Sequence, residues 1–90
     1  MATTELLAPT TAAGSSAAFT VTDTPVPVAI KADYKDIGSD WISIERKTSG
    51  GHWLAVGRLT REVPALVVEG AGEYRATKRP SEHAIGADQG

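Results

Sequence analysis

The side chains that could carry out catalysis in this chain of 90 residues are few. The chain contains no cysteine, which removes thiolate nucleophiles and cysteine ligands for zinc. Its histidines are His52 and His83, and no HxH or HExxH spacing joins either of them to a second ligand. Ser49 precedes Gly50-Gly51 but lacks the leading glycine of a GxSxG nucleophile elbow, so the glycine pair predicts a hairpin turn. We therefore expect no enzymatic activity, no bound metal and no cofactor.

Acidic side chains gather in one predicted loop. Asp33 and Asp36 flank Tyr34-Lys35, and Asp40 follows four residues later. An oxygen-rich loop could bind calcium, but the EF-hand pattern with its terminal glutamate is absent, and solvated carboxylates are the simpler interpretation. The stretch "GAGEYR" has neither the third glycine nor the lysine of a phosphate-binding loop.

Trp41 and Trp53 offer binding chemistry instead. They belong to the stretch 41–57, which alternates in polarity on both sides of a Ser-Gly-Gly break and is typical of a β-hairpin. Without a bulge, both tryptophans lie on the face opposite the aliphatic side chains, where they would mark a protein interface or a sugar-stacking platform. A bulge at Gly50-Gly51 would instead bury Trp53. The aliphatic set expected in the core is Ile42, Ile44, Leu54 and Val56.

Short strands must position these residues. Apolar and polar residues alternate with a period of two between residues 17 and 79, and no stretch keeps a helical period. Pro25 and Pro27 cannot donate to a ladder, so their strand is expected at a sheet edge or paired on one side only. The spacing of strands and turns predicts a small antiparallel β-sandwich, with a barrel as the alternative. The strands are expected within residues 16–23, 24–33, 41–46, 52–58, 64–70 and 72–79.

Tyr74 follows the turn Gly70-Ala71-Gly72 and begins the last of these strands. This placement resembles the tyrosine corner of immunoglobulin-like sandwiches, in which the ring packs in the core and the hydroxyl binds upstream backbone. The cysteine pair of immunoglobulin domains is absent. The resemblance implies an all-β, immunoglobulin-like or similar sandwich.

The two ends of the chain have a different composition from its middle. Residues 1–16 are rich in Ala and Thr without a sustained period, and residues 80–90 are similar, so we expect an extended N-terminal arm, a sandwich over residues 17–79 and a C-terminal tail. The formal charge is −2, without the basic stripe that nucleic-acid binding requires. No apolar run is long enough to span a bilayer and the first residues do not form a signal peptide, so we expect no membrane partner.

Three stretches together carry a resemblance to a known class of proteins: "FTVTDTPVPVAIKAD", "WISIERKTSGGHWLAVG" and "GEYRAT". They resemble the small β-sandwich virion proteins of tailed bacteriophages, over about residues 17–79. The resemblance implies a structural decoration or cement protein that binds the major capsid protein on the capsid surface, forms homo-oligomers and is assembled in the host cytoplasm. The alternatives are a neck or tail adaptor of the same virion and a carbohydrate-binding module.

Partner-binding residues are expected in the arms and in the hairpin. The arms, with Leu6 and Leu7 as an apolar spot, would clamp neighbouring subunits. Trp41 and Trp53 would anchor the interface. The charged runs "ERK" and "TKR" are either solvent-facing strand ends or salt-bridge partners of the bound protein, through Arg46 and Arg79.

Overall fold

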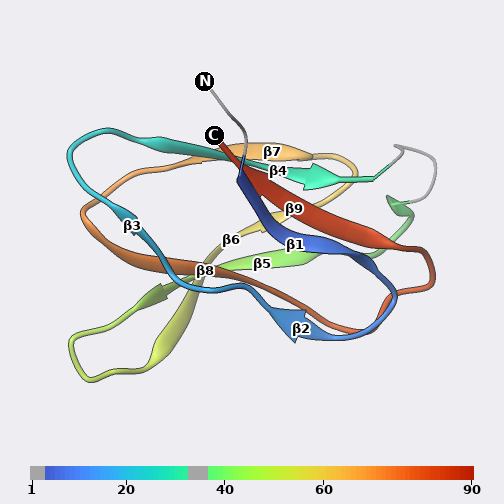
Figure 1. Cartoon of the computed structure of the whole chain (residues 1–90), viewed down its shortest axis with the longest axis horizontal. Helices are drawn as coiled ribbons and strands as arrows, with labels where there is room; N and C mark the ends of the chain where they lie inside the picture. Colours follow the sequence, from blue (N-terminus) through green and yellow to red (C-terminus); the bar gives the residue numbers. More distant parts are fainter. Residues whose placement is uncertain (1–3, 33–36) are drawn as a thin grey trace.

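The computed structural model describes residues 4–32 and 37–90 and arranges them as nine strands in two antiparallel sheets. The strands are β1 (Thr4–Thr10), β2 (Gly14–Ser15), β3 (Phe19–Val21), β4 (Val26–Lys31), β5 (Ile42–Lys47), β6 (Trp53–Leu59), β7 (Ala65–Val68), β8 (Gly72–Lys78) and β9 (Ile85–Gln89). One sheet has the order β1-β9-β4-β7, and the other has the order β2-β8-β5-β6 with β3 also paired to β8. The two sheets form the layers seen in Figure 1, which confirms the predicted all-β antiparallel sandwich.

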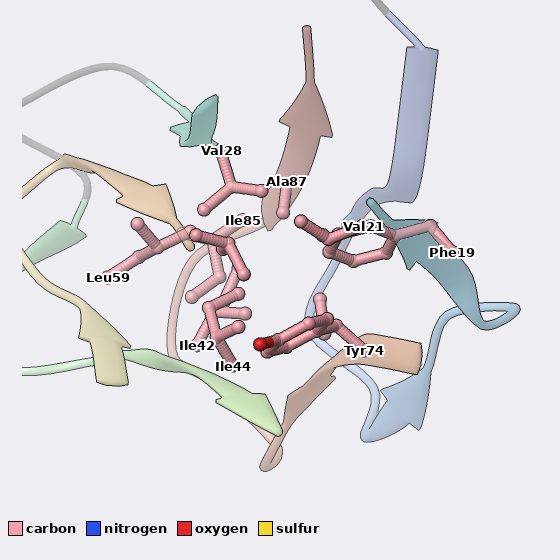
Figure 2. Packing of buried hydrophobic residues seen from close by; sticks show 11 residues of the cluster. Phe19, Val21, Val28, Ile42, Ile44, Leu59, Tyr74, Ile85 and Ala87 are labelled. Atoms are coloured by element: carbon pink, nitrogen blue, oxygen red, sulfur yellow. The ribbon is translucent and has the colours of Figure 1, made fainter. Parts of the chain in front are cut away.

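Apolar side chains from both sheets form the core between the layers (Figure 2). In β5 the period of two is plain, because Ile42 and Ile44 are fully buried while Ser43 and Glu45 are only partly covered. Burying an aliphatic or aromatic side chain of this size contributes about 1.5–3 kcal/mol. The other buried members of the core are Phe19, Val21, Val28, Leu59, Val68, Tyr74, Ala76, Ile85 and Ala87.

Tyr74 forms the tyrosine corner that its position predicted. The ring is buried and packs against Phe19 at a centroid distance of 6.0 Å. The hydroxyl lies 2.8 Å from the carbonyl oxygen of Gly70 and 3.0 Å from that of Glu69, so its single proton is shared between two upstream acceptors. Gly70 has a φ of +99°, and a Cβ there would lie 3.3 Å from the Tyr74 hydroxyl, which is why glycine suits this turn.

The described parts of both ends, from residue 4 and up to residue 90, belong to the sandwich, which corrects the predicted arm, tail and boundaries at residues 16–17 and 79–80. Thr4–Thr10 forms the edge strand β1, which pairs with β9, and β9 in turn pairs with β4. Leu6 and Leu7 are half-buried and pack against the core, so they do not form a free clamp. Ile85 and Ala87 are fully buried. Pairing satisfies the backbone of both ends and covers apolar side chains, and this outweighs their weak sequence pattern.

Lys78 ties both ends to the centre of the five-stranded sheet. Its side chain is buried, and its ammonium donates to the carbonyl oxygens of Thr10 at 2.6 Å and Ala12 at 2.8 Å and to the Oγ of Ser81 at 3.0 Å. Burial lowers the pKa of Lys78 below its ordinary value, and the negative charge of Asp40 offsets part of this effect. One side chain therefore joins the segment after β1, strand β8 and the segment before β9.

The proline-containing strand β4 lies inside its sheet, which corrects the prediction of an edge strand. It pairs with β7 on one side and β9 on the other. The pairing with β9 begins at Val28 opposite Gln89, and beyond it the backbone nitrogen of Gly90 donates to the carbonyl oxygen of Pro27. The missing N–H of Pro27 thus faces Gly90, just beyond the end of β9, so the sheet loses little by it.

Candidate functional site

The β5–β6 hairpin determines which side chains the five-stranded sheet presents to solvent. Its turn is closed by Thr48 N donating to His52 O at 2.7 Å and Gly51 N donating to Thr48 O at 2.9 Å, with Gly51 at φ +84°. Along the strands, Ile44 pairs with Gly57 and the next residue, Glu45, pairs with Ala55. The bulge therefore lies at Val56 in β6 and not at the glycine pair.

Half of the predicted core set is wrong, and the bulge accounts for Val56. Ile42 and Ile44 are buried as expected, but Leu54 is 62% exposed and Val56 is 54% exposed. After the shift in register, Gly57 and Leu59 stand opposite Ile44 and Ile42. Leu54 pairs with Arg46 on the turn side of the bulge. The tip of the β5–β6 hairpin projects beyond the rest of the sandwich in Figure 1.

Trp41 and Trp53 both lie on the outer face of the five-stranded sheet, which is the arrangement predicted for a hairpin without a bulge, although β6 is bulged at Val56. Trp53 pairs with Lys47, which alternates with the buried Ile42 and Ile44. Both indoles are half-buried because arginine side chains cover them. The Cζ of Arg75 lies 4.4 Å from the ring centroid of Trp53.

Two further arginines cover Trp41 from the strands on either side of β5. Arg58 of β6 has its Cζ 4.8 Å from the ring centroid of Trp41, and Arg79, directly after β8, has its Cζ 5.2 Å from it. Both distances lie within the range of attractive cation–π contacts. We call this surface the Trp–Arg face; it consists of Trp41, Trp53, Arg58, Arg75 and Arg79.

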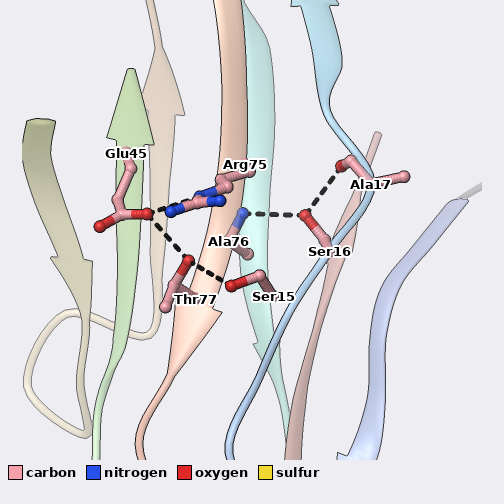
Figure 3. A network of polar contacts seen from close by, with 7 residues as sticks. All are labelled: Ser15, Ser16, Ala17, Glu45, Arg75, Ala76 and Thr77. Carbon is pink, nitrogen blue, oxygen red and sulfur yellow. Dashed lines mark hydrogen bonds and ion pairs between the residues drawn. The ribbon is translucent and has the colours of Figure 1, made fainter. Parts of the chain in front are cut away.

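A polar network holds the centre of the Trp–Arg face in place (Figure 3). The carboxylate of Glu45 accepts from Arg75 Nε at 2.7 Å and from the hydroxyl of Thr77 at 2.9 Å. Ser15 of β2 continues the row, with its Oγ 3.1 Å from that of Thr77. Burial alone would raise the pKa of Glu45, but the hydrogen bonds from Arg75 and Thr77 outweigh it and lower the pKa below the ordinary value of 4.5. The network therefore fixes the guanidinium that covers Trp53.

Replacing Glu45 with glutamine is expected to lower the free energy of unfolding by about 1 kcal/mol at neutral pH, because a partly covered, charge-assisted hydrogen-bond pair is lost. The contribution of Glu45 is present above pH 4.5 and is lost as the pH falls through the lowered folded-state pKa. Urea unfolding of both proteins at neutral pH and again well below pH 4.5 should show the difference shrinking in acid. An equal difference at both pH values would contradict the role of the Glu45 carboxylate.

The predicted partner-binding residues fall into three groups. Trp41, Trp53 and Arg79 lie on the Trp–Arg face, with Trp41 and Trp53 at opposite ends of β5. Leu6 and Leu7 pack against the core, as described above. The guanidinium of Arg46 donates to the carbonyl oxygen of Ala71 at 2.8 Å and lies 5.9 Å from the ring of Tyr74, so it supports the turn before β8.

The sequence did not lead us to name Arg58 and Arg75 as site residues, although the alternation of inward and outward positions places both on the outer face. Arg75 alternates with the buried Tyr74 and Ala76, which places it on the outer face once the core face is known. Arg58 precedes the buried Leu59 and is placed on the same face by the same rule. Arginines at outward positions of neighbouring strands were therefore the sequence feature that indicates both residues.

Exposed aliphatic side chains form a second surface, where strands β6 and β7 are the open edges of their sheets. Leu54 and Val56 border one hollow, and Val56 and Val67 border the next. Val67 is 57% exposed, so exposed aliphatic side chains border both hollows. We call this surface the edge strip; it consists of Leu54, Val56 and Val67.

The remaining candidates from the sequence gain no support as a site. His52 and His83 are both exposed, and no three His, Asp or Glu side chains of residues 4–32 and 37–90 gather where they could hold a metal ion. Asp33 and Asp36 of the calcium hypothesis lie outside the described residues, and Asp40 accepts the backbone N–H of Glu82 at 3.3 Å. Over the same ranges, the structure has no helix of the length and apolarity that would cross a membrane.

No protein-family model, no curated protein and no solved structure matches this chain. The candidate site therefore rests on the geometry of the Trp–Arg face.

Proposed function

We propose that this chain is a structural, non-enzymatic protein that docks on a larger protein assembly through the Trp–Arg face. In its specific form, the proposal is a decoration or cement protein that binds the major capsid protein on the surface of a bacteriophage head. One observation carries it: two tryptophans on one sheet face are covered by three arginine guanidiniums. Tryptophan and arginine are the side chains most enriched at the energetic centres of protein interfaces.

The rigidity of the Trp–Arg face supports the same proposal. Arg75 is held by Glu45, and Arg58 and Arg79 are stacked on Trp41, so these long side chains lose little rotamer freedom when a partner binds. Strands β1 and β9 pair within the other sheet and add to its stability. A small domain with a firm outward face of this kind suits a protein that reinforces an assembly.

The carbohydrate-binding alternative is weaker. Stacking a sugar requires an open aromatic ring. Here a guanidinium lies over the ring of Trp53 and two lie over that of Trp41, so a sugar would have to displace charged groups that already bind the ring. A neck or tail adaptor differs from the capsid proposal only in the neighbouring protein.

Self-association is part of the proposal, and the edge strip is the surface that supports it. Leu54, Val56 and Val67 lie beside the unpaired edges of β6 and β7, where a second copy could cover apolar area and pair backbone groups. Sedimentation equilibrium over a range of concentrations tests this. Val56→Lys should shift the protein towards monomer, whereas a wild-type protein that is monomeric throughout would contradict it.

Binding to capsids that lack this protein tests the main proposal. The wild-type chain should co-sediment with such capsids saturably and should not bind a glycan panel. Trp53→Leu should weaken capsid binding by about 30-fold, the effect of losing one interface hot spot of about 2 kcal/mol. Val63→Ser, at a residue that is 47% exposed and outside the Trp–Arg face, serves as the control.

Glycan binding without capsid binding would contradict the proposal, and binding to purified tails in place of heads would favour the adaptor. Deletion of the N-terminal residues is unsuitable as a test, because it would remove β1 from its sheet.

A further inference from the structure

Two positive charges on the Trp–Arg face have no acidic partner in the part of the chain that the structure describes. The guanidiniums of Arg58 and Arg79 lie over Trp41, and neither forms an ion pair with a carboxylate among residues 4–32 and 37–90. Their stacking fixes where the charges lie before any partner arrives.

The other basic side chains on the same face are neutralised. Arg75 Nε lies 2.7 Å from the carboxylate of Glu45. Lys47 Nζ lies 3.7 Å from the carboxylate of Glu73. Uncompensated positive charge on this face is therefore concentrated at the end that carries Trp41.

A hollow of about 150 Å³ opens beside Trp41 and Arg79, between Ser39, Asp40 and Pro80. Asp40 is the acidic residue in its wall, and its carboxylate is engaged by the backbone N–H of Glu82 at 3.3 Å. Among the three charged groups Arg58, Arg79 and Asp40, the positive charges outnumber the negative charge by one. The site thus combines a concave surface, an indole and two guanidiniums.

We propose that Arg58 and Arg79 bind carboxylate side chains of an acidic segment of a partner protein, with Trp41 packing against that segment. The inference rests on the proposed function, because it names the chemistry of the partner at the docking face. A guanidinium matches a carboxylate in a two-pronged hydrogen-bonded geometry and is weakly hydrated, so the pair forms at low desolvation cost.

The charge pattern favours an acidic protein segment over a nucleic acid. An extended polyanion needs a continuous row of basic groups. On this sheet the two guanidiniums are followed by the ion pairs of Arg75 with Glu45 and of Lys47 with Glu73, which offer no net positive charge to the phosphates of a longer strand. One or two carboxylates at a defined position fit the pair better.

Titration of the isotope-labelled protein with a short oligoglutamate peptide tests the inference by nuclear magnetic resonance. Oligoglutamine serves as the neutral peptide, and inorganic phosphate and a short single-stranded oligonucleotide serve as the other anions. The oligoglutamate should shift the Trp41 indole N–H and the Nε–H of Arg58 and Arg79, and oligoglutamine should not. The double variant Arg58→Gln with Arg79→Gln should bind about tenfold more weakly, as expected for two partly exposed charge pairs.

Lys47→Gln is the matched control, because the charge of Lys47 is already paired with Glu73 and the residue is not a member of the Trp–Arg face, and it should change the affinity for oligoglutamate by less than about twofold. Equal binding by the double variant, an equal loss in Lys47→Gln, or tighter binding of the oligonucleotide than of oligoglutamate would each overturn the inference.

Capsid binding separates this inference from the proposed function. If the double variant binds capsids as tightly as the wild-type protein does, the acidic-segment inference is overturned and the docking proposal stands. If the wild-type protein binds oligoglutamate as expected but no capsid or tail, the docking proposal is overturned and the anion-binding assignment stands.

Discussion

Replacing Gly86 with alanine is expected to lower the free energy of unfolding by about 3 kcal/mol, the upper part of the usual range for an overpacked interior. Gly86 lies in β9, where β1 crosses it closely. A Cβ at this position would overlap the carbonyl oxygen of Leu7 and would lie 2.8 Å from the backbone nitrogen of Pro9. Both neighbours are backbone atoms, so relief requires that β1 move away from β9. Chemical denaturation measures the loss of stability, and hydrogen exchange should show loss of protection in Thr4–Thr10.

Gly14→Ala is the matched control for this prediction. Gly14 is an exposed residue of β2, and an added Cβ there meets no atom within 4 Å. Alanine at this position should leave the stability unchanged within about 0.5 kcal/mol. If Gly86→Ala behaved like Gly14→Ala, then β1 would not be packed on β9 as described, and the residues before β2 would again be a free arm.

Replacing Lys78 with methionine is expected to lower the free energy of unfolding by about 2 kcal/mol at neutral pH. Methionine keeps the apolar stem but removes the donor that binds Thr10 O, Ala12 O and Ser81 Oγ. Losing one partner leaves covered acceptors unsatisfied, which costs about 1–3 kcal/mol. Urea unfolding monitored by tryptophan fluorescence measures the change, and increased exchange of the Ser81 N–H, which donates to Thr11 O, reports the loosened contact.

Lys47→Met provides the comparison. The side chain of Lys47 is 45% exposed, and its ion pair with Glu73 is 3.7 Å long, so its loss should cost less than about 0.5 kcal/mol. Similar losses in the two variants would mean that the buried contacts of Lys78 contribute nothing beyond those of an ordinary surface lysine.

The ends of the chain could not be placed from sequence because their strands lack the alternation that reveals a strand. The pairing of β1 with β9 is irregular between Glu5 and Leu7 and again between Leu7 and Thr10. These shifts break the period of two, so Leu6 and Leu7 look like an isolated apolar spot. In β9 the buried residues include Gly86 and Ala87, whose small size admits β1 but carries no hydrophobic signal.

The middle of the chain was more predictable because its strands alternate. The burial of Ile42 and Ile44 and the tyrosine corner at Tyr74 both follow from local patterns. The bulge at Val56 does not, because it depends on the opposite sheet. In an unbulged strand, Val56 would take the inward position opposite Ile44. Here Gly57 takes that position, and a Cβ at Gly57 would lie 3.3 Å from the side chain of Leu66.

The sequence predicts which residues point outward from the five-stranded sheet, but it does not predict which of them contact one another. Alternation places Trp53 and Arg75 on one face, yet only the register shows that Arg75 stands over the indole at 4.4 Å. The distance between Trp41 and Arg58 likewise depends on the shifted register of β6. Once the ends of the chain are part of the sandwich, this face replaces the arms as the candidate for docking.

Hydroxyl-radical footprinting of the wild-type protein, free and bound to capsids that lack it, tests most directly the claim that docking uses the Trp–Arg face. We predict that Trp41 and Trp53, which are half-buried in the free chain, become protected from oxidation on binding, while Leu6 and Leu7 keep the reactivity that they have in the free protein. Protection confined to Leu6, Leu7 and the C-terminal segment, with both tryptophans unchanged, would contradict the account.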